Sequence, residues 1–164
     1  MKTQILKAIV ATTTLAAIGL GATAANAATA NANARARILR QVTLTNTSDL
    51  QFGTVVTGAA ASTVAISSTG ARTCGAGLVC SGATTAADFT IGGTTGSVVT
   101  ISVPASVSLT SGANTMTATL AASAATATMV ANAGAFSVGG TLAVGANQAD
   151  GDYIGTFTAT VDYQ

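Results

Sequence analysis

The sequence lacks histidine and glutamate, and its only lysines, Lys2 and Lys7, lie within the first seven residues. The side chains left for acid–base chemistry are five aspartates and two tyrosines. Without histidine, no serine has a base partner for nucleophilic catalysis, and the two cysteines have too few co-ligands for a metal. Asp150 and Asp152 flank Gly151 as in a polar turn, and two carboxylates are too few for a calcium cage. We therefore expect neither enzymatic activity nor a cofactor.

Charge is also scarce, at 7% of all residues. Once Lys2 and Lys7 are set aside, four arginines and five aspartates remain, which gives a net charge of 4 − 5 = −1. Because binding to nucleic acid needs many cations on one face, we expect no nucleic-acid partner. So little charge suits a protein whose surface is largely covered by copies of itself.

The first 27 residues have the pattern of a secretion signal. Two lysines precede a largely apolar stretch over residues 8–21, and Ala25-Asn26-Ala27 matches a small-x-small cleavage site. The apolar stretch is short and rich in Thr and Gly for a membrane span, although a retained N-terminal anchor is the alternative. We predict removal of residues 1–27, which leaves 137 residues, enough for one domain, with no membrane span.

The remaining sequence favours β-structure. It is rich in Val, Ile and Thr, has one proline, Pro104, and contains no amphipathic helix of useful length. Short alternating segments are separated by turn residues, as in the hairpin predicted around residues 111–114 and the last strand, 153–163. We expect an antiparallel β-sandwich. The predicted core is Leu44, Phe52, Val64, Ile66, Phe89, Ile101, Leu109, Leu120, Phe136, Leu142, Phe157 and Val161.

Two cysteines, Cys74 and Cys80, lie in a glycine-rich segment. An exported chain meets an oxidising compartment, so we predict a disulfide between them. The loop that it closes is short, and its contribution to stability is therefore expected to be only about 2 kcal/mol.

The start of the mature chain alternates small apolar with polar residues from Ala28 to Ile38 without a break. A period of two places the apolar side chains on one face of an extended strand. That face consists of Ala30, Ala32, Ala34, Ala36 and Ile38. A strand with no hairpin partner needs a sheet edge, either in its own chain or in a neighbouring copy.

Three segments carry a resemblance to a known group of proteins. They are Leu50-Gln51-Phe52-Gly53-Thr54-Val55, Phe136-x-Val138-Gly139-Gly140-x-Leu142-x-Val144 and Gly151-x-Tyr153-x-Gly155-x-Phe157-x-Ala159-x-Val161-x-Tyr163. Together they resemble a family of exported bacterial domains that is similar to spore-coat-U and archaic chaperone–usher pilins. The likeness covers essentially the whole mature chain.

The resemblance implies an immunoglobulin-like sandwich, residues 40–164, that lacks one strand and is completed by a donor strand, residues 28–39 of a neighbouring copy. The implied acceptor groove and chaperone-binding strand carries Tyr153, Phe157, Ala159, Val161 and Tyr163. The expected function is that of a surface-fibre subunit supporting adhesion or biofilm, exported through the periplasm with the help of a chaperone and an outer-membrane usher. The link is heterologous, so it propagates as a fibre.

Two other hypotheses remain open at this point. The N-terminal strand can instead complete its own domain and give a secreted monomer that binds glycan or protein through its loops. The Thr-Ala-Thr triplets at residues 117–119 and 126–128 raise an ice-binding surface, but a regular threonine array needs a regular repeat, which the sequence does not have.

Overall fold

The computed structural model describes residues 27–164, and this part of the chain is built from strands without a helix. None of its segments is a helix long and apolar enough to cross a membrane. The predicted signal peptide lies, apart from Ala27, outside the described residues. Residues 1–36 and 37–164 form separate units, so the strands below are all those of the second unit.

Twelve strands are present within residues 37–164. They are β1 (Thr43–Ser48), β2 (Thr54–Val56), β3 (Ser62–Ile66), β4 (Arg72–Cys74), β5 (Val79–Ser81), β6 (Ala87–Gly92), β7 (Val98–Ser102), β8 (Ser106–Ser111), β9 (Asn114–Ala122), β10 (Thr126–Thr128), β11 (Ala133–Val144) and β12 (Thr160–Tyr163). All the pairings between them are antiparallel, which confirms the all-β class.

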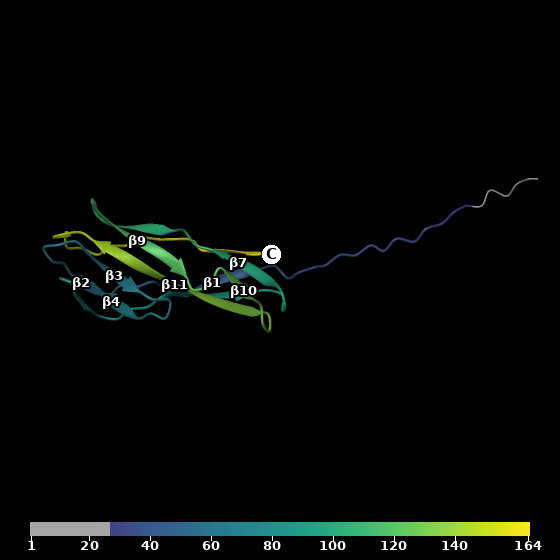
Figure 1. Cartoon of the computed structure of the whole chain (residues 1–164), viewed down its shortest axis with the longest axis horizontal. Coiled ribbons are helices and arrows are strands. Elements are labelled where there is room, and N and C mark those ends of the chain that lie inside the picture. Colours follow the sequence, from purple (N-terminus) through teal and green to yellow (C-terminus); the bar gives the residue numbers. More distant parts are fainter. Residues whose placement is uncertain (1–26) are drawn as a thin grey trace, which may run out of the picture. The chain divides into compact units, whose positions relative to one another are not determined.

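Strand β11 organises the largest sheet (Figure 1). Val138 pairs with both Ala87 of β6 and Ala122 of β9, so these two strands lie on opposite edges of β11. Further along, β3 takes the place of β6 on the same edge. The sheet continues outward to β1 beyond β6, to β4 beyond β3 and to β8 beyond β9, and it curls into a half-barrel.

Two smaller sheets accompany the half-barrel. One has the order β10-β7-β12, so the last strand pairs with β7, and the other is the two-stranded ribbon β2-β5. In Figure 1 the C-terminus accordingly lies beside β7.

The buried side chains form two clusters. The larger one is built around Phe89 and Phe136, whose rings stack with centroids 5.0 Å apart. The smaller one is built around Phe52, Val64 and Leu142. Of the predicted core, Leu44, Leu109, Leu120 and Phe157 are only partly buried, and the rest are buried.

Several strand predictions are confirmed, and others need correction. The hairpin around residues 111–114 is β8–β9, with Ser111 opposite Asn114. Residues 136–144 lie within a single strand, β11, with Gly139 and Gly140 inside it. Burial alternates over residues 157–163 of the predicted last strand, but Gly155 is exposed although it belongs to the predicted inner face. Only Thr160–Tyr163 forms a strand, which pairs with β7.

The predicted disulfide between Cys74 and Cys80 is present and ties β4 to β5. Beside it, Arg72 donates hydrogen bonds to the carbonyl oxygens of Ser81 (2.7 Å), Gly82 and Phe52. Gly53, with φ +75°, leaves the space that this guanidinium occupies, since a Cβ there would lie 2.6 Å from Arg72 Nη1.

Candidate functional site

An open groove of about 640 Å³ lies on the domain of residues 37–164. One wall is formed by β1 and the residues after it, and the other wall by the C-terminal segment before β12. The residues that line it are Leu44, Asn46, Asp49, Leu50, Gln51, Phe52, Ala87, Phe89, Val107, Leu109, Tyr153, Ile154, Gly155, Thr156, Phe157, Thr158 and Ala159.

Both walls of the groove offer backbone groups without a strand partner. Within the described residues, β1 pairs only with β6. The opposite wall touches β8 through a single bridge, in which Thr110 and Ile154 exchange two hydrogen bonds of 2.9 and 3.1 Å. Unpaired edges of this kind are templates for an added strand.

Apolar side chains form the floor of the groove. Phe89 is buried at its base and meets Phe157 of the C-terminal wall edge-on, with ring centroids 6.3 Å apart. Leu44, Val107 and Leu109 are each half-buried in the groove. An added strand with an apolar face would complete their burial.

The predicted acceptor residues divide into two groups. Tyr153, Phe157 and Ala159 line the groove. Val161 instead lies in the larger core cluster, only 9% exposed, and Tyr163 follows at the end of β12.

Tyr163 takes part in a hydrogen-bonded clamp at the start of the second unit. Its hydroxyl accepts a bond from the Thr94 amide (2.8 Å) and donates one to the Arg40 carbonyl (2.9 Å). The Arg40 amide in turn donates to Thr94 Oγ1 (2.8 Å). Arg37 donates to the hydroxyl of Ser97 (3.0 Å), a serine that is 4% exposed. We call these five residues the clamp.

The residues of the predicted donor strand, 28–39, form no β-strand in the described part of the chain. Residues 27–36 are all exposed, and their backbone is in neither a helix nor a sheet. Ile38, just beyond them and next to the clamp, is 92% exposed. It is the most exposed of the large apolar side chains in the described part of the chain.

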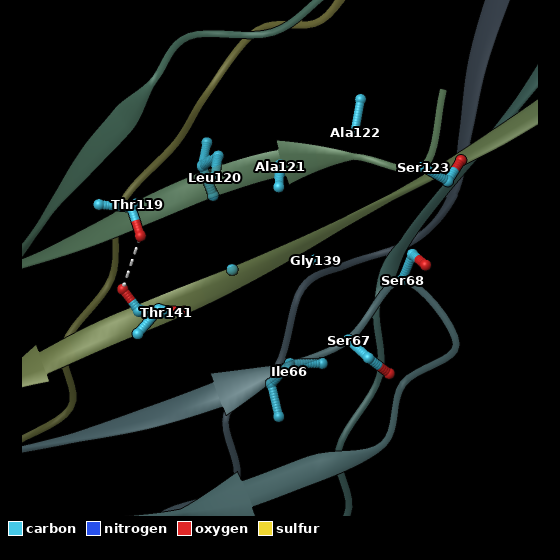
Figure 2. Close-up of a pocket in the computed structure, with 11 residues that line it drawn as sticks. Ile66, Ser67, Ser68, Thr119, Leu120, Ala121, Ala122, Ser123, Gly139 and Thr141 are labelled. Atoms are coloured by element: carbon cyan, nitrogen blue, oxygen red, sulfur yellow. Dashed lines mark hydrogen bonds between the residues drawn. The ribbon is translucent and has the colours of Figure 1, made fainter. Parts of the chain in front are cut away.

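A second hollow, of about 310 Å³, lies where the turn after β3 crosses β11. Figure 2 shows Ser67, Ser68 and Ser123 around it and the hydrogen bond from Thr119 to the Thr141 carbonyl. Gly139 permits the crossing, because a Cβ there would lie 2.5 Å from the Ile66 carbonyl oxygen. None of the residues that line this hollow is charged or aromatic. Among residues 27–164 no group of three acidic, cysteine or histidine side chains is placed to hold a metal.

Sequence reasoning missed one wall of the groove and the clamp. No local pattern in the sequence indicates that β1 and the residues after it face residues 153–159. Thr94, Ser97 and Arg40 are far from Tyr163 in sequence, and nothing in the sequence pairs them. The N-terminal alternation was the one signal that a free strand edge was needed.

Comparison with curated proteins and with solved structures finds no match for this chain. Residues 42–163, by contrast, match a family described as a domain of unknown function, DUF4402. The match begins one residue before β1 and ends at the last residue of β12, so it covers both walls of the groove. The chain therefore belongs to the DUF4402 family.

Proposed function

We propose that this protein is the structural subunit of a bacterial surface fibre, in which the groove of one copy takes the N-terminal segment, residues 28–39, of the next. The observation that carries the proposal is the groove itself, with two unpaired strand edges facing each other over an apolar floor. One extended strand laid between those edges satisfies both sets of backbone groups at once.

The fold that this function requires is an immunoglobulin-like sandwich that lacks one strand. In this proposal the half-barrel and the β10-β7-β12 sheet are the two layers, and the groove is the position of the missing strand; the sheet orders and the lining of the groove support it. Similarity to spore-coat-U and archaic chaperone–usher pilins is part of the same proposal. It rests on the three sequence segments, which fall in the β1 wall and the loop after it, in β11 and in the C-terminal wall.

The energetics assign the leading role in side-chain burial to Ile38. Burying an isoleucine contributes roughly 1.5–3 kcal/mol, whereas one methyl-sized group contributes about 0.8 kcal/mol. Ile38 is therefore the largest contribution from a single side chain, and the four alanines together contribute about as much as Ile38 alone. The backbone ladder adds roughly 0.5–1.5 kcal/mol for each hydrogen bond.

Export completes the proposal. A subunit with an open apolar groove needs cover until its neighbour arrives, because exposed strand edges aggregate. We assign that cover to a periplasmic chaperone bound along residues 153–163, and delivery to the cell surface to an outer-membrane usher.

The first test is a gel of material sheared from the cell surface and probed for this chain, with and without boiling in detergent. A ladder that collapses to one band only on heating supports strand exchange between copies. One band in both lanes, or signal only in the medium, would instead support a monomer that completes its own domain with residues 28–39.

A single substitution tests the apolar face of the segment. Ile38→Asp should abolish the ladder, because assembly would drive a carboxylate into the apolar groove. The domain itself should keep its unfolding midpoint, since Ile38 is 92% exposed. Asn33→Asp is the matched control, because it adds the same charge on the opposite face of the strand and should assemble normally. A normal ladder from Ile38→Asp would count against this side chain facing the groove.

A further inference from the structure

The two ends of the groove differ. At one end the clamp joins the residues before β1 to the end of β12, through the bond from Tyr163 to the Arg40 carbonyl. Since β1 runs away from this point and the C-terminal wall runs toward it, the opposite end holds the last residues of one wall and the first of the other. Those residues are Asp49 to Phe52 and Tyr153 to Ile154.

Charge differs between the same two ends. The clamp end carries Arg37 and Arg40 together with Asp162 of β12, whereas the one arginine near the far end, Arg72, is bonded to backbone carbonyl oxygens, that of Phe52 among them. At the far end, Asp49 lines the groove, and Asp150 and Asp152 directly precede Tyr153. All three carboxylates belong to exposed residues. We call this the acidic end.

The N-terminal segment carries its own charge in its second half. Arg35 is its only charged residue before the clamp, and it lies two residues ahead of Arg37. If the apolar alanines face the groove, Arg35 lies on the opposite face of the strand, at the rim. Residue 39 is the end of the segment nearest to its own domain, so in a donated segment Arg35 lies closer to the donor's domain, and to the mouth of the groove, than the alanines before it.

We propose that the groove receives a second copy's segment through the acidic end, where Arg35 of that copy lies beside Asp49, and that this charge pairing selects copies of this chain as donors. The inference rests on the proposed function and adds to it the direction, the contact and the selectivity.

Two observations favour this direction. The receiving copy's own N-terminal segment is attached at the clamp end, where Arg37 is bonded to Ser97, and not at the acidic end. The reverse direction would bring the incoming Arg35 beside the receiving copy's Arg37 and Arg40, and like charges repel.

The charge pair acts mainly on the rate of association. An exposed pair changes an equilibrium by a factor of only about 1.5 to 5. Steering by opposite charges raises association rates by roughly 10 to 1,000-fold at low salt and fades as salt is added.

The experiment is a charge exchange in the full mature chain, with polymer growth followed by light scattering at low salt. Arg35→Asp alone and Asp49→Arg alone should each slow growth by about tenfold or more. The double variant Arg35→Asp/Asp49→Arg should recover the original rate. Equal amounts of the two single variants should also grow together, since each then offers the segment that the other's groove accepts.

The matched control is Asp162→Arg, an exposed aspartate on β12 at the clamp end. The pair Arg35→Asp/Asp162→Arg should stay slow. Recovery by Asp162→Arg instead of Asp49→Arg, or full-rate growth of Arg35→Asp, would overturn the inference while leaving strand exchange standing. Absence of any polymer from the unmodified chain would overturn both.

Discussion

At the scale of the residue, Tyr163 shows how a single hydroxyl joins distant parts of the chain. It bonds to Thr94 and to Arg40, which lies 123 positions away in sequence. The resemblance implies that Tyr163 belongs to the acceptor strand, whereas the hydroxyl of Tyr163 is hydrogen-bonded within the clamp. The residue therefore links the strand that carries the groove wall to the root of the N-terminal segment.

Tyr163→Phe should loosen the attachment of Arg40 at the clamp, while the aromatic ring at position 163 is kept. Loss of the hydroxyl should cost about 1–2 kcal/mol of unfolding free energy, since its two hydrogen bonds each contribute roughly 0.5–1.5 kcal/mol. Amide hydrogen exchange at Arg40 and Thr94 should become faster, because both residues then lose a partner or a neighbour that orders them. Chemical denaturation and exchange measured by NMR give the two quantities.

Tyr153→Phe is the control for this prediction. Its hydroxyl also makes two hydrogen bonds, to Gln148 and to the Ala149 carbonyl, but at the acidic end. A comparable loss of stability with unchanged exchange at Arg40 is expected. Equal exchange at Arg40 in both variants would contradict the clamp.

The core predicted from single residues is largely correct because burial follows hydrophobicity at alternating positions. The missed core residues have another origin. Met129 is 1% exposed although it follows an Ala- and Thr-rich stretch with no clear pattern. It is buried because its backbone is bonded to Ser97 and Gly96 across the loop before β7. Local sequence patterns do not predict such long-range backbone hydrogen bonds.

At the scale of the element, the last strand separates what periodicity predicts from what it does not. The sequence predicts alternation over 153–163, and the exposure alternates over 157–163, whereas residues 154–156 are all exposed. Alternation does not show whether a strand is paired with a neighbour. Only residues 160–163 are hydrogen-bonded to another strand, β7. The unpaired first half is the part that becomes a groove wall. Similarly, β11 passes through Gly139 and Gly140, where the backbone of the segment after β3 and of β9 approaches too closely for a side chain.

The disulfide element gives a quantitative prediction. Cys74 and Cys80 are six positions apart, so the closed loop is short and its loss should cost about 2 kcal/mol. Replacing both cysteines by serine should lower the unfolding free energy by that amount. Urea denaturation of the oxidised, reduced and substituted chains provides the comparison.

The β2-β5 ribbon and β4 are the elements that this bond ties together, and neither lines the groove. Assembly by the doubly substituted chain should therefore continue below its unfolding midpoint. Loss of assembly from a chain that is still folded would show that the ribbon takes part in the contact between copies.

At the scale of the whole molecule, the sequence predicted that the N-terminal strand needs a sheet edge, but it did not predict where that edge lies. The N-terminal alternation indicated that an edge was required, but the groove combines β1, the floor from β6 and β8, and the segment before β12. These segments come together only through the order of strands around β11, which no local pattern encodes. Half of the proposed binding surface was therefore out of reach of the sequence, as was the separation of charge between its ends.

The whole-molecule prediction is that the groove still binds the N-terminal segment, residues 28–39, when the segment is supplied as a separate peptide. A chain lacking residues 28–36 should not polymerise, because it keeps the groove and the clamp but has lost most of the strand to donate. A synthetic peptide of residues 28–39 should bind this chain and raise its melting temperature. At a peptide concentration of 100 times Kd the gain is about 2.7 kcal/mol, which corresponds to roughly 10 °C for a domain of this size.

The control is the same peptide with Ile38→Asp, which should leave the melting temperature unchanged. If the shortened chain still forms polymers, the copies are joined by a surface other than this segment. If neither peptide shifts the melting temperature, the groove is not the acceptor. A shift with the native peptide alone requires both parts of the mechanism, because only an apolar strand and an open groove together produce selective stabilisation.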